Sequence, residues 1–211
     1  MSNQTFSIKR LDKMPFTGLF IFMLQRKLRQ SGEMSEDELE VVEYYYLSRI
    51  GEIEKFLWIT VIFALLSIAH LPIFLVTSIV VLSIRIPSGG MHSNSTWGCF
   101  CLTLLIFLTA IFVLPQIPLN MIGMIVIAIF SIIICYMASP IRGIDREKYI
   151  DKSKDKLLKY AATTITSVWF ILIFVLNNNH HGFAITMIWA IFLQNLQLMI
   201  EYYKRKRLHN L

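Results

Sequence analysis

The chain has 211 residues, of which 55% are hydrophobic and only 16% are charged, and its mean hydropathy is +0.59. Because soluble domains carry about 25% charged residues, this composition excludes an ordinary soluble protein and indicates several membrane-spanning helices. The net charge of +6 would also suit a nucleic-acid-binding protein. In a membrane protein, however, basic cytoplasmic loops account for such an excess, so we expect no nucleic-acid partner.

Residues 1–55 are predicted to form helices at the cytoplasmic face of the membrane. Apolar residues recur there at helical spacing and basic residues accompany them, as in an interfacial amphipathic helix. The apolar positions are Phe16, Leu19, Phe20, Met23 and Leu28, and the basic ones are Arg26, Lys27 and Arg29. Ser35 and Glu38 then have the spacing of a capping box, which predicts a second helix that runs toward the membrane. Its apolar face is formed by Leu39, Val42, Tyr46, Ile50 and Ile53.

Five apolar runs define the predicted membrane region, residues 56–200. They cover residues 56–86, 97–114, 119–137, 162–176 and 183–200. Each of the last four approaches the length of one helical crossing. The first run is longer, and we expect it to break near His70-Leu71-Pro72 into a short hairpin, which either crosses the membrane twice or is re-entrant. The sequence thus predicts an all-α polytopic membrane protein with about six membrane helices, four long spans plus this N-terminal hairpin.

The distribution of lysine and arginine orients these helices. Seven basic residues lie within residues 142–159, and four more lie at positions 204–207 of the C-terminal tail, residues 201–211. The links 115–118 and 177–182 carry none. The positive-inside rule therefore places both termini in the cytoplasm. We expect the whole chain, residues 1–211, to form a single integral membrane domain with a basic cytoplasmic tail.

A polar island between the first two apolar runs holds the candidate active site. It reads Arg-Ile-Pro-Ser-Gly-Gly-Met-His-Ser-Asn-Ser-Thr-Trp-Gly-Cys from Arg85 to Cys99. His92 and Cys99, seven positions apart, suggest a thiol nucleophile with its own base. On one continuous helix they would stand about 10.5 Å apart, so a working pair needs a chain break between them. The stretches 87–90 and 93–96 supply turn-forming residues for such a break.

The position of Cys99 favours a reactive thiol, although a purely structural role for this cysteine remains an alternative. With Thr96 as N-cap, Cys99 would lie in the first turn of the next helix, where the helix dipole favours a thiolate. Asn94 and Ser95 are the nearest candidates for a third, orienting residue. The alternative is that Cys99 is only a small apolar residue of a span. The cysteine count of three fits neither a disulfide framework nor a metal site, so no cofactor is expected.

The pattern of Arg85, Gly89, Gly90, His92 and Cys99 resembles the hallmark of the accessory gene regulator B (AgrB) family, membrane cysteine endopeptidases that mature quorum-sensing peptides in Gram-positive bacteria. The family pattern is an arginine, a Gly-Gly pair, a histidine two positions on, and a cysteine seven after the histidine. All of these are present here. The chain departs from the family at several other positions, and these departures bear on which peptide is recognised.

The resemblance implies a mechanism and a substrate. Cys99 would attack a short amphipathic propeptide at its C-terminal cleavage point, with His92 as general base and then general acid. A thioester acyl-enzyme would form, and an internal cysteine or serine of the peptide would then close a thiolactone or lactone ring.

Partners and substrate contacts also follow from the resemblance. Arg85 could hold an acidic group of the substrate in a bidentate contact. The remaining candidate substrate contacts are Gly89, Gly90, Asn94 and Ser95. The implied partners are an AgrD-like propeptide and the lipid bilayer of a bacterial cell membrane.

Two other classes of protein remain as alternatives, a small membrane transporter or exporter and a non-catalytic membrane subunit. The interiors of the apolar runs hold no Asp, Glu or Lys, which argues against ion-coupled transport. A non-catalytic subunit predicts that Cys99→Ala alters packing alone. Gln194, Asn195 and Gln197 in the last run could make an internal polar contact or support a homodimer.

Overall fold

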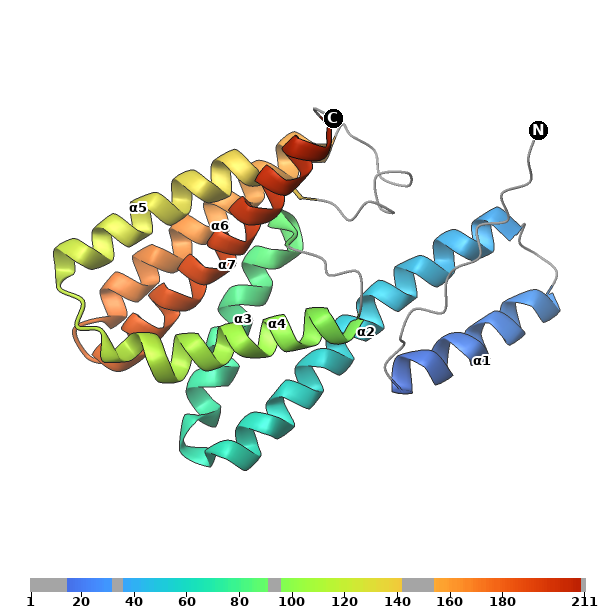
Figure 1. The fold of residues 1–211 in the computed structure, drawn as a ribbon, viewed down its shortest axis with the longest axis horizontal. Helices are drawn as coiled ribbons and strands as arrows, with labels where there is room; N and C mark the ends of the chain where they lie inside the picture. Colours follow the sequence, from blue (N-terminus) through green and yellow to red (C-terminus); the bar gives the residue numbers. More distant parts are fainter. Residues whose placement is uncertain (1–14, 32–35, 91–95, 142–153, 210–211) are drawn as a thin grey trace. The chain divides into compact units, whose positions relative to one another are not determined.

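The computed structural model describes residues 15–31, 36–90, 96–141 and 154–209 (Figure 1). Within these ranges almost all residues are helical, and β-type pairing is limited to one isolated bridge. Among the described residues, five segments are long and apolar enough to cross a membrane: Ile68–Ser88, Trp97–Gln116, Met121–Ala138, Asp155–Leu176 and His181–Arg207. The predicted all-α, multi-pass membrane fold is therefore confirmed.

The chain divides into two compact units. The first comprises residues 1–62 and 93–101, and the second comprises residues 63–92 and 102–211. Helix α2, Glu36–Leu66, and helix α4, Thr96–Leu108, each contribute to both units.

In the first unit, helix α1, Pro15–Ser31, lies against α2. Its exposed apolar residues include Phe16, Leu19, Phe20, Phe22 and Met23, so the predicted amphipathic helix exists. The first turn of α1 is capped by a carboxylate from α2. Glu54 accepts hydrogen bonds from the backbone N–H groups of Phe16 and Thr17 and from the Thr17 hydroxyl, at 3.1, 2.8 and 2.6 Å. These contacts satisfy N–H groups that a helix start leaves without partners.

Helix α2 begins at Glu36, directly after the predicted N-cap Ser35, which lies outside the described residues. It runs without a break to Leu66, so the predicted surface helix and the first arm of the hairpin form one helix. The chain turns at Ser67, whose backbone is extended, and passes through the 3₁₀ helix η1, Ile68–His70. The predicted break in this run is thereby confirmed.

Helix α3, Leu71–Ser88, forms the second arm of the hairpin. Pro72 lies in its first turn, where the missing N–H of a proline costs nothing. The helix continues two residues beyond the predicted run, through Pro87 to Ser88, and Gly89 is its C-cap.

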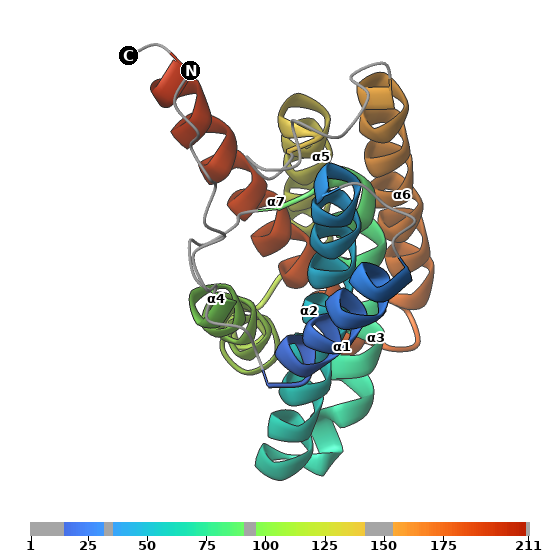
Figure 2. The ribbon, with the colours of Figure 1, turned by 90° about the vertical axis from the view of Figure 1, so that its right-hand side faces the viewer.

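The second unit is a bundle of helices (Figure 2), and its core is apolar. Besides α3, the bundle contains α5 (Met121–Ala138), α6 (Asp155–Leu176) and α7 (His181–His209). Both α3 and α5 pack against α6 and α7. The buried core residues are Val80, Ile84, Met124, Ala128, Phe170, Ile173, Ala184, Met187, Ile188 and Ile191. The π-helix η2, Thr109–Val113, and the 3₁₀ helix η3, Leu114–Gln116, lead from α4 toward α5. Asn120 caps α5 by accepting a hydrogen bond from the N–H of Gly123 at 2.8 Å.

Candidate active site

Cys99 is the fourth residue of α4 and is 7% exposed. The first N–H groups of a helix have no intrahelical acceptor, and the dipole favours negative charge at that end. The sequence predicts Thr96 as the N-cap, whereas Thr96 is itself the first residue of the helix. The predicted location of the thiol in the first turn is unaffected. A thiolate at Cys99 would therefore lie where the helix stabilises it.

The predicted base, His92, lies outside the described residues, as do Asn94 and Ser95. The pairing of His92 with Cys99 and the identity of a third residue among these positions therefore stay predictions.

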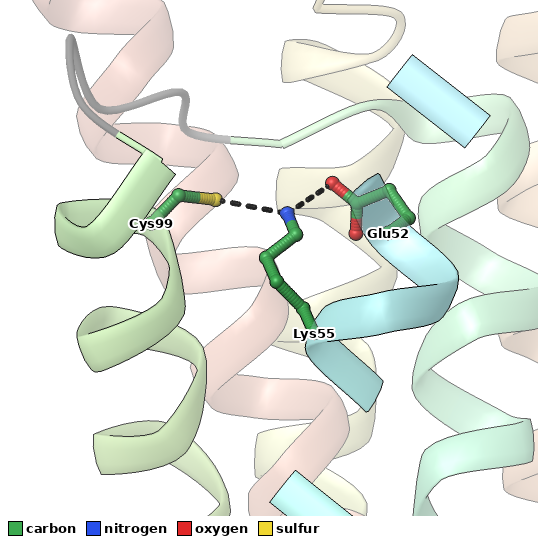
Figure 3. A network of polar contacts seen from close by, with 3 residues as sticks. All are labelled: Glu52, Lys55 and Cys99. Carbon is green, nitrogen blue, oxygen red and sulfur yellow. Dashed lines mark hydrogen bonds and ion pairs between the residues drawn. The ribbon is translucent and has the colours of Figure 1, made fainter. Parts of the chain in front are cut away.

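The structure adds a residue that the sequence patterns did not single out. The ammonium nitrogen of Lys55, on α2, donates a hydrogen bond to the sulfur of Cys99 over 3.3 Å (Figure 3). The same nitrogen lies 2.5 Å from Oε1 of Glu52, three residues earlier on the helix. Lys55 is 5% exposed, and lysine is almost never so deeply buried unless it is paired. The first unit thus brings a cation, an acid and the candidate nucleophile together.

A sequence signal for this cluster did exist. Lys55 is the last charged residue before the apolar run that starts at residue 56, and Glu52 precedes it at helical spacing. The patterns alone, however, give no reason to connect Lys55 with a cysteine 44 positions away.

Gly89, in the second unit, has a backbone that only glycine adopts easily. Its φ is +77°, and a Cβ added there would lie 1.9 Å from the carbonyl oxygen of Ile141. The chain pairs at this point, because the N–H of Ile141 donates to the carbonyl of Ser88 over 2.9 Å. Gly89 is therefore required by the close approach of two chain segments, and its predicted contact with substrate stays a prediction.

Arg85 and Gly90 lie close together in the same unit. A Cβ added at Gly90 would meet Nε of Arg85 at 3.3 Å and Nε2 of Gln194 at 3.6 Å. Gln194 is 1% exposed and donates to the carbonyl of Gly89 over 3.3 Å. One of the two roles considered for Gln194, an internal polar contact, is thereby confirmed. Three members of the predicted motif, Arg85, Gly89 and Gly90, are thus gathered at the end of α3.

No group of three or more His, Cys, Asp or Glu side chains in the described ranges is arranged to hold a metal ion. None of the three cysteines, all of which lie in the described ranges, forms a disulfide, and Cys99 and Cys135 are buried whereas Cys101 is exposed. The chemistry available to the described part of the site is therefore that of a thiol beside an ammonium group.

The chain matches the family model described as accessory gene regulator B over residues 22–198. It is 26% identical over 168 residues to a protein of Clostridium beijerinckii named AgrB-like, and this alignment covers 79% of the chain and 80% of that protein. No solved structure matches the chain. The matched range contains the whole polar island and Lys55.

Proposed function

The chain belongs to the accessory gene regulator B family, and on that premise we propose that it is a membrane cysteine endopeptidase that cleaves and cyclises a short propeptide. Family membership implies a part in the maturation of a quorum-sensing peptide, and the proposal adds the chemistry. The observation that carries it is the setting of Cys99, a buried thiol in the first turn of a helix with an ammonium group 3.3 Å from its sulfur. Reactive cysteines occupy such electropositive settings.

The first step forms an acyl-enzyme. His92 takes the proton of the Cys99 thiol, and the sulfur attacks the carbonyl carbon at the C-terminal cleavage point of the propeptide. The carbonyl electron pair moves to oxygen and returns as the C–N bond breaks. The proton on His92 then passes to the leaving amine. The products are a thioester on Cys99 and a free C-terminal tail of the propeptide.

The second step closes the ring. An internal thiol or hydroxyl of the bound peptide gives its proton to His92 and attacks the thioester carbonyl. The bond between the carbonyl carbon and the Cys99 sulfur breaks, and the sulfur leaves as a thiolate. The peptide leaves as a thiolactone or lactone. Exclusion of water favours this outcome, because water competes with the internal nucleophile for the thioester.

The substrate that fits this site is a short amphipathic propeptide lying on the inner leaflet of a bacterial membrane. The exposed apolar residues and nearby basic residues of α1 suit a protein that also lies partly in the interface. Arg85 is our candidate for holding an acidic group of the substrate, since a guanidinium matches a carboxylate in a two-pronged contact.

The test is intact-mass analysis of a co-expressed cognate propeptide with the wild type, Cys99→Ala and His92→Ala. We expect the wild type to release the C-terminal tail and to carry a thioester adduct. Both variants should lose cleavage by on the order of a thousandfold or more. The matched control is Cys101→Ala, which removes an exposed cysteine two residues further along the same helix and should cleave normally. Equal processing by the wild type and Cys99→Ala would overturn the proposal.

A further inference from the structure

We propose that Lys55 is a catalytic cation of this endopeptidase, whose ammonium group stabilises the negative charge that forms on the Cys99 sulfur, and that Glu52 positions that ammonium group. The inference rests on the proposed function, because it requires Cys99 to be the nucleophile. All three residues belong to the first unit, and they come from α2 and from the first turn of α4 (Figure 3).

The burial of Lys55 is the first argument. Removing an ammonium group from water is costly, and a lysine near a membrane face ordinarily extends its chain until the charge reaches water or headgroups. Here the residue is 5% exposed and its nitrogen lies between a sulfur and a carboxylate. Arrangements that break an ordinary rule of burial are expected at functional sites.

The geometry of the contact is the second argument. The thiolate, not the thiol, is the nucleophile, and a nearby lysine favours it. Nζ of Lys55 is 3.3 Å from Sγ of Cys99, and attraction between opposite charges strengthens away from bulk water. Glu52 binds the same nitrogen at 2.5 Å from the same helix. It therefore orients the ammonium group toward the sulfur.

The reaction uses this cation twice. When His92 removes the thiol proton, the negative charge left on sulfur faces Lys55. When the ring closes, the bond between sulfur and the carbonyl carbon breaks and its electron pair returns to sulfur beside the same ammonium group. Lys55 keeps its three protons throughout, so it stabilises Cys99 both as nucleophile and as leaving group.

The test measures alkylation of Cys99 by iodoacetamide at neutral pH in the detergent-solubilised full chain, together with cleavage of the co-expressed propeptide. Cys101 is the internal reference, because it is exposed and lies on the same helix. Lys55→Met removes the charge at similar length, and Lys55→Arg keeps a cation. Lys204→Met, at an exposed lysine of α7, is the matched control.

We expect Lys55→Met to slow both Cys99 alkylation and propeptide cleavage by at least about tenfold, the scale of a hydrogen bond to a charged group. Cys101 should react at its wild-type rate in every variant. Lys55→Arg should keep most of both activities, and Lys204→Met should keep all of them. Glu52→Gln should lower both rates by a smaller factor, and Glu52→Asp should restore part of the loss.

Wild-type rates of Cys99 alkylation and of cleavage in Lys55→Met would overturn the inference. Should that variant fail to fold, Lys55→Gln takes its place.

Failure of the proposed function itself would look different. Cys99→Ala would then process the propeptide like the wild type, whereas the alkylation rates would still show whether Lys55 acts on the sulfur. If Lys55→Met cleaves the propeptide as fast as the wild type, the proposed function stands and only the role inferred for Lys55 is refuted.

Discussion

At the scale of single residues, the two adjacent glycines of the motif are not equivalent. A methyl group at Gly89 would strike the backbone carbonyl of Ile141, and the φ of +77° disfavours any other residue. A methyl group at Gly90 would instead meet the side chains of Arg85 and Gln194, at 3.3 Å or more. We therefore expect Gly89→Ala to destabilise the protein by about 2–4 kcal/mol and Gly90→Ala to cost less.

The measurement for the glycine pair is the free energy of unfolding of the detergent-solubilised variants. Gly182→Ala is the control, because a Cβ there would meet no atom within 4 Å, and it should leave stability unchanged or raise it slightly. Equal losses for Gly89→Ala and Gly90→Ala would contradict the close approach of Gly89 to Ile141.

The sequence motif singles out Gly89 and Gly90 on different grounds. The sequence identifies the Gly-Gly pair as part of a motif and as a place where a helix ends, and Gly89 is indeed the C-cap of α3. It could not show why Gly89 must be glycine, because the segment that excludes a side chain is 52 positions further along the chain. Contacts of this kind leave no local periodicity.

At the scale of elements, the contact between α1 and α2 depends on one buried carboxylate. Glu54 is 3% exposed and accepts hydrogen bonds from Phe16, Thr17 and Trp58. Burial alone would raise the pKa of Glu54, but the hydrogen bonds from Thr17, Phe16 and Trp58 outweigh it, so the pKa lies below its ordinary value of 4.5. The charged form thus holds the first turn of α1 on α2.

This carboxylate makes the docking of α1 sensitive to acid. The lowered pKa means that the undocked state takes up the proton first, so the stabilisation is fully present above pH 4.5 and is lost as the pH falls through the lower pKa of the docked state. We expect the amide-exchange protection factors of α1 to drop over that acid range. Glu54→Gln should lower the protection factors of α1 already at neutral pH, by an amount that corresponds to about 1.5–3 kcal/mol in the free energy of opening. The same variant should remove their dependence on pH.

Thr17→Val serves as a graded control, because it removes one of the hydrogen bonds to Glu54 and keeps the charge. It should weaken the protection of α1 while retaining its fall in acid. Protection of α1 in the wild type that does not change below pH 4.5 would contradict the role assigned to Glu54.

Elements were more predictable than their contacts. Apolar periodicity predicted α1, and a proline in a long apolar run predicted the break after α2, because both signals arise within one or two helical turns. The contact of Lys55 with Cys99 joins two elements through space. Lys55 stands directly before the apolar run that starts at residue 56, so its position in the sequence is that of an ordinary charge at the membrane surface.

At the scale of the whole molecule, α7 connects a neutral link to a basic end. Its 29 residues extend about 43 Å, more than the roughly 30 Å of a bilayer core. The link before it, 177–180, carries no lysine or arginine, whereas its last turns contain Lys204, Arg205, Lys206 and Arg207. The positive-inside rule therefore predicts that the C-terminal end of α7 lies in the cytoplasm.

Single cysteines placed at the two ends of α7 test this orientation, in a background in which Cys99, Cys101 and Cys135 are replaced by alanine. Asn178 and Lys206 are both exposed, so a membrane-impermeant maleimide should label Asn178→Cys in intact cells and Lys206→Cys only after permeabilisation. A membrane-permeant maleimide should label both and controls for reactivity. Counting one crossing for each of α4 to α7 along the chain puts Cys99 at the same face as Lys206. Labelling in the reverse order would move the candidate nucleophile to the outer face, where a propeptide made in the cytoplasm does not reach it.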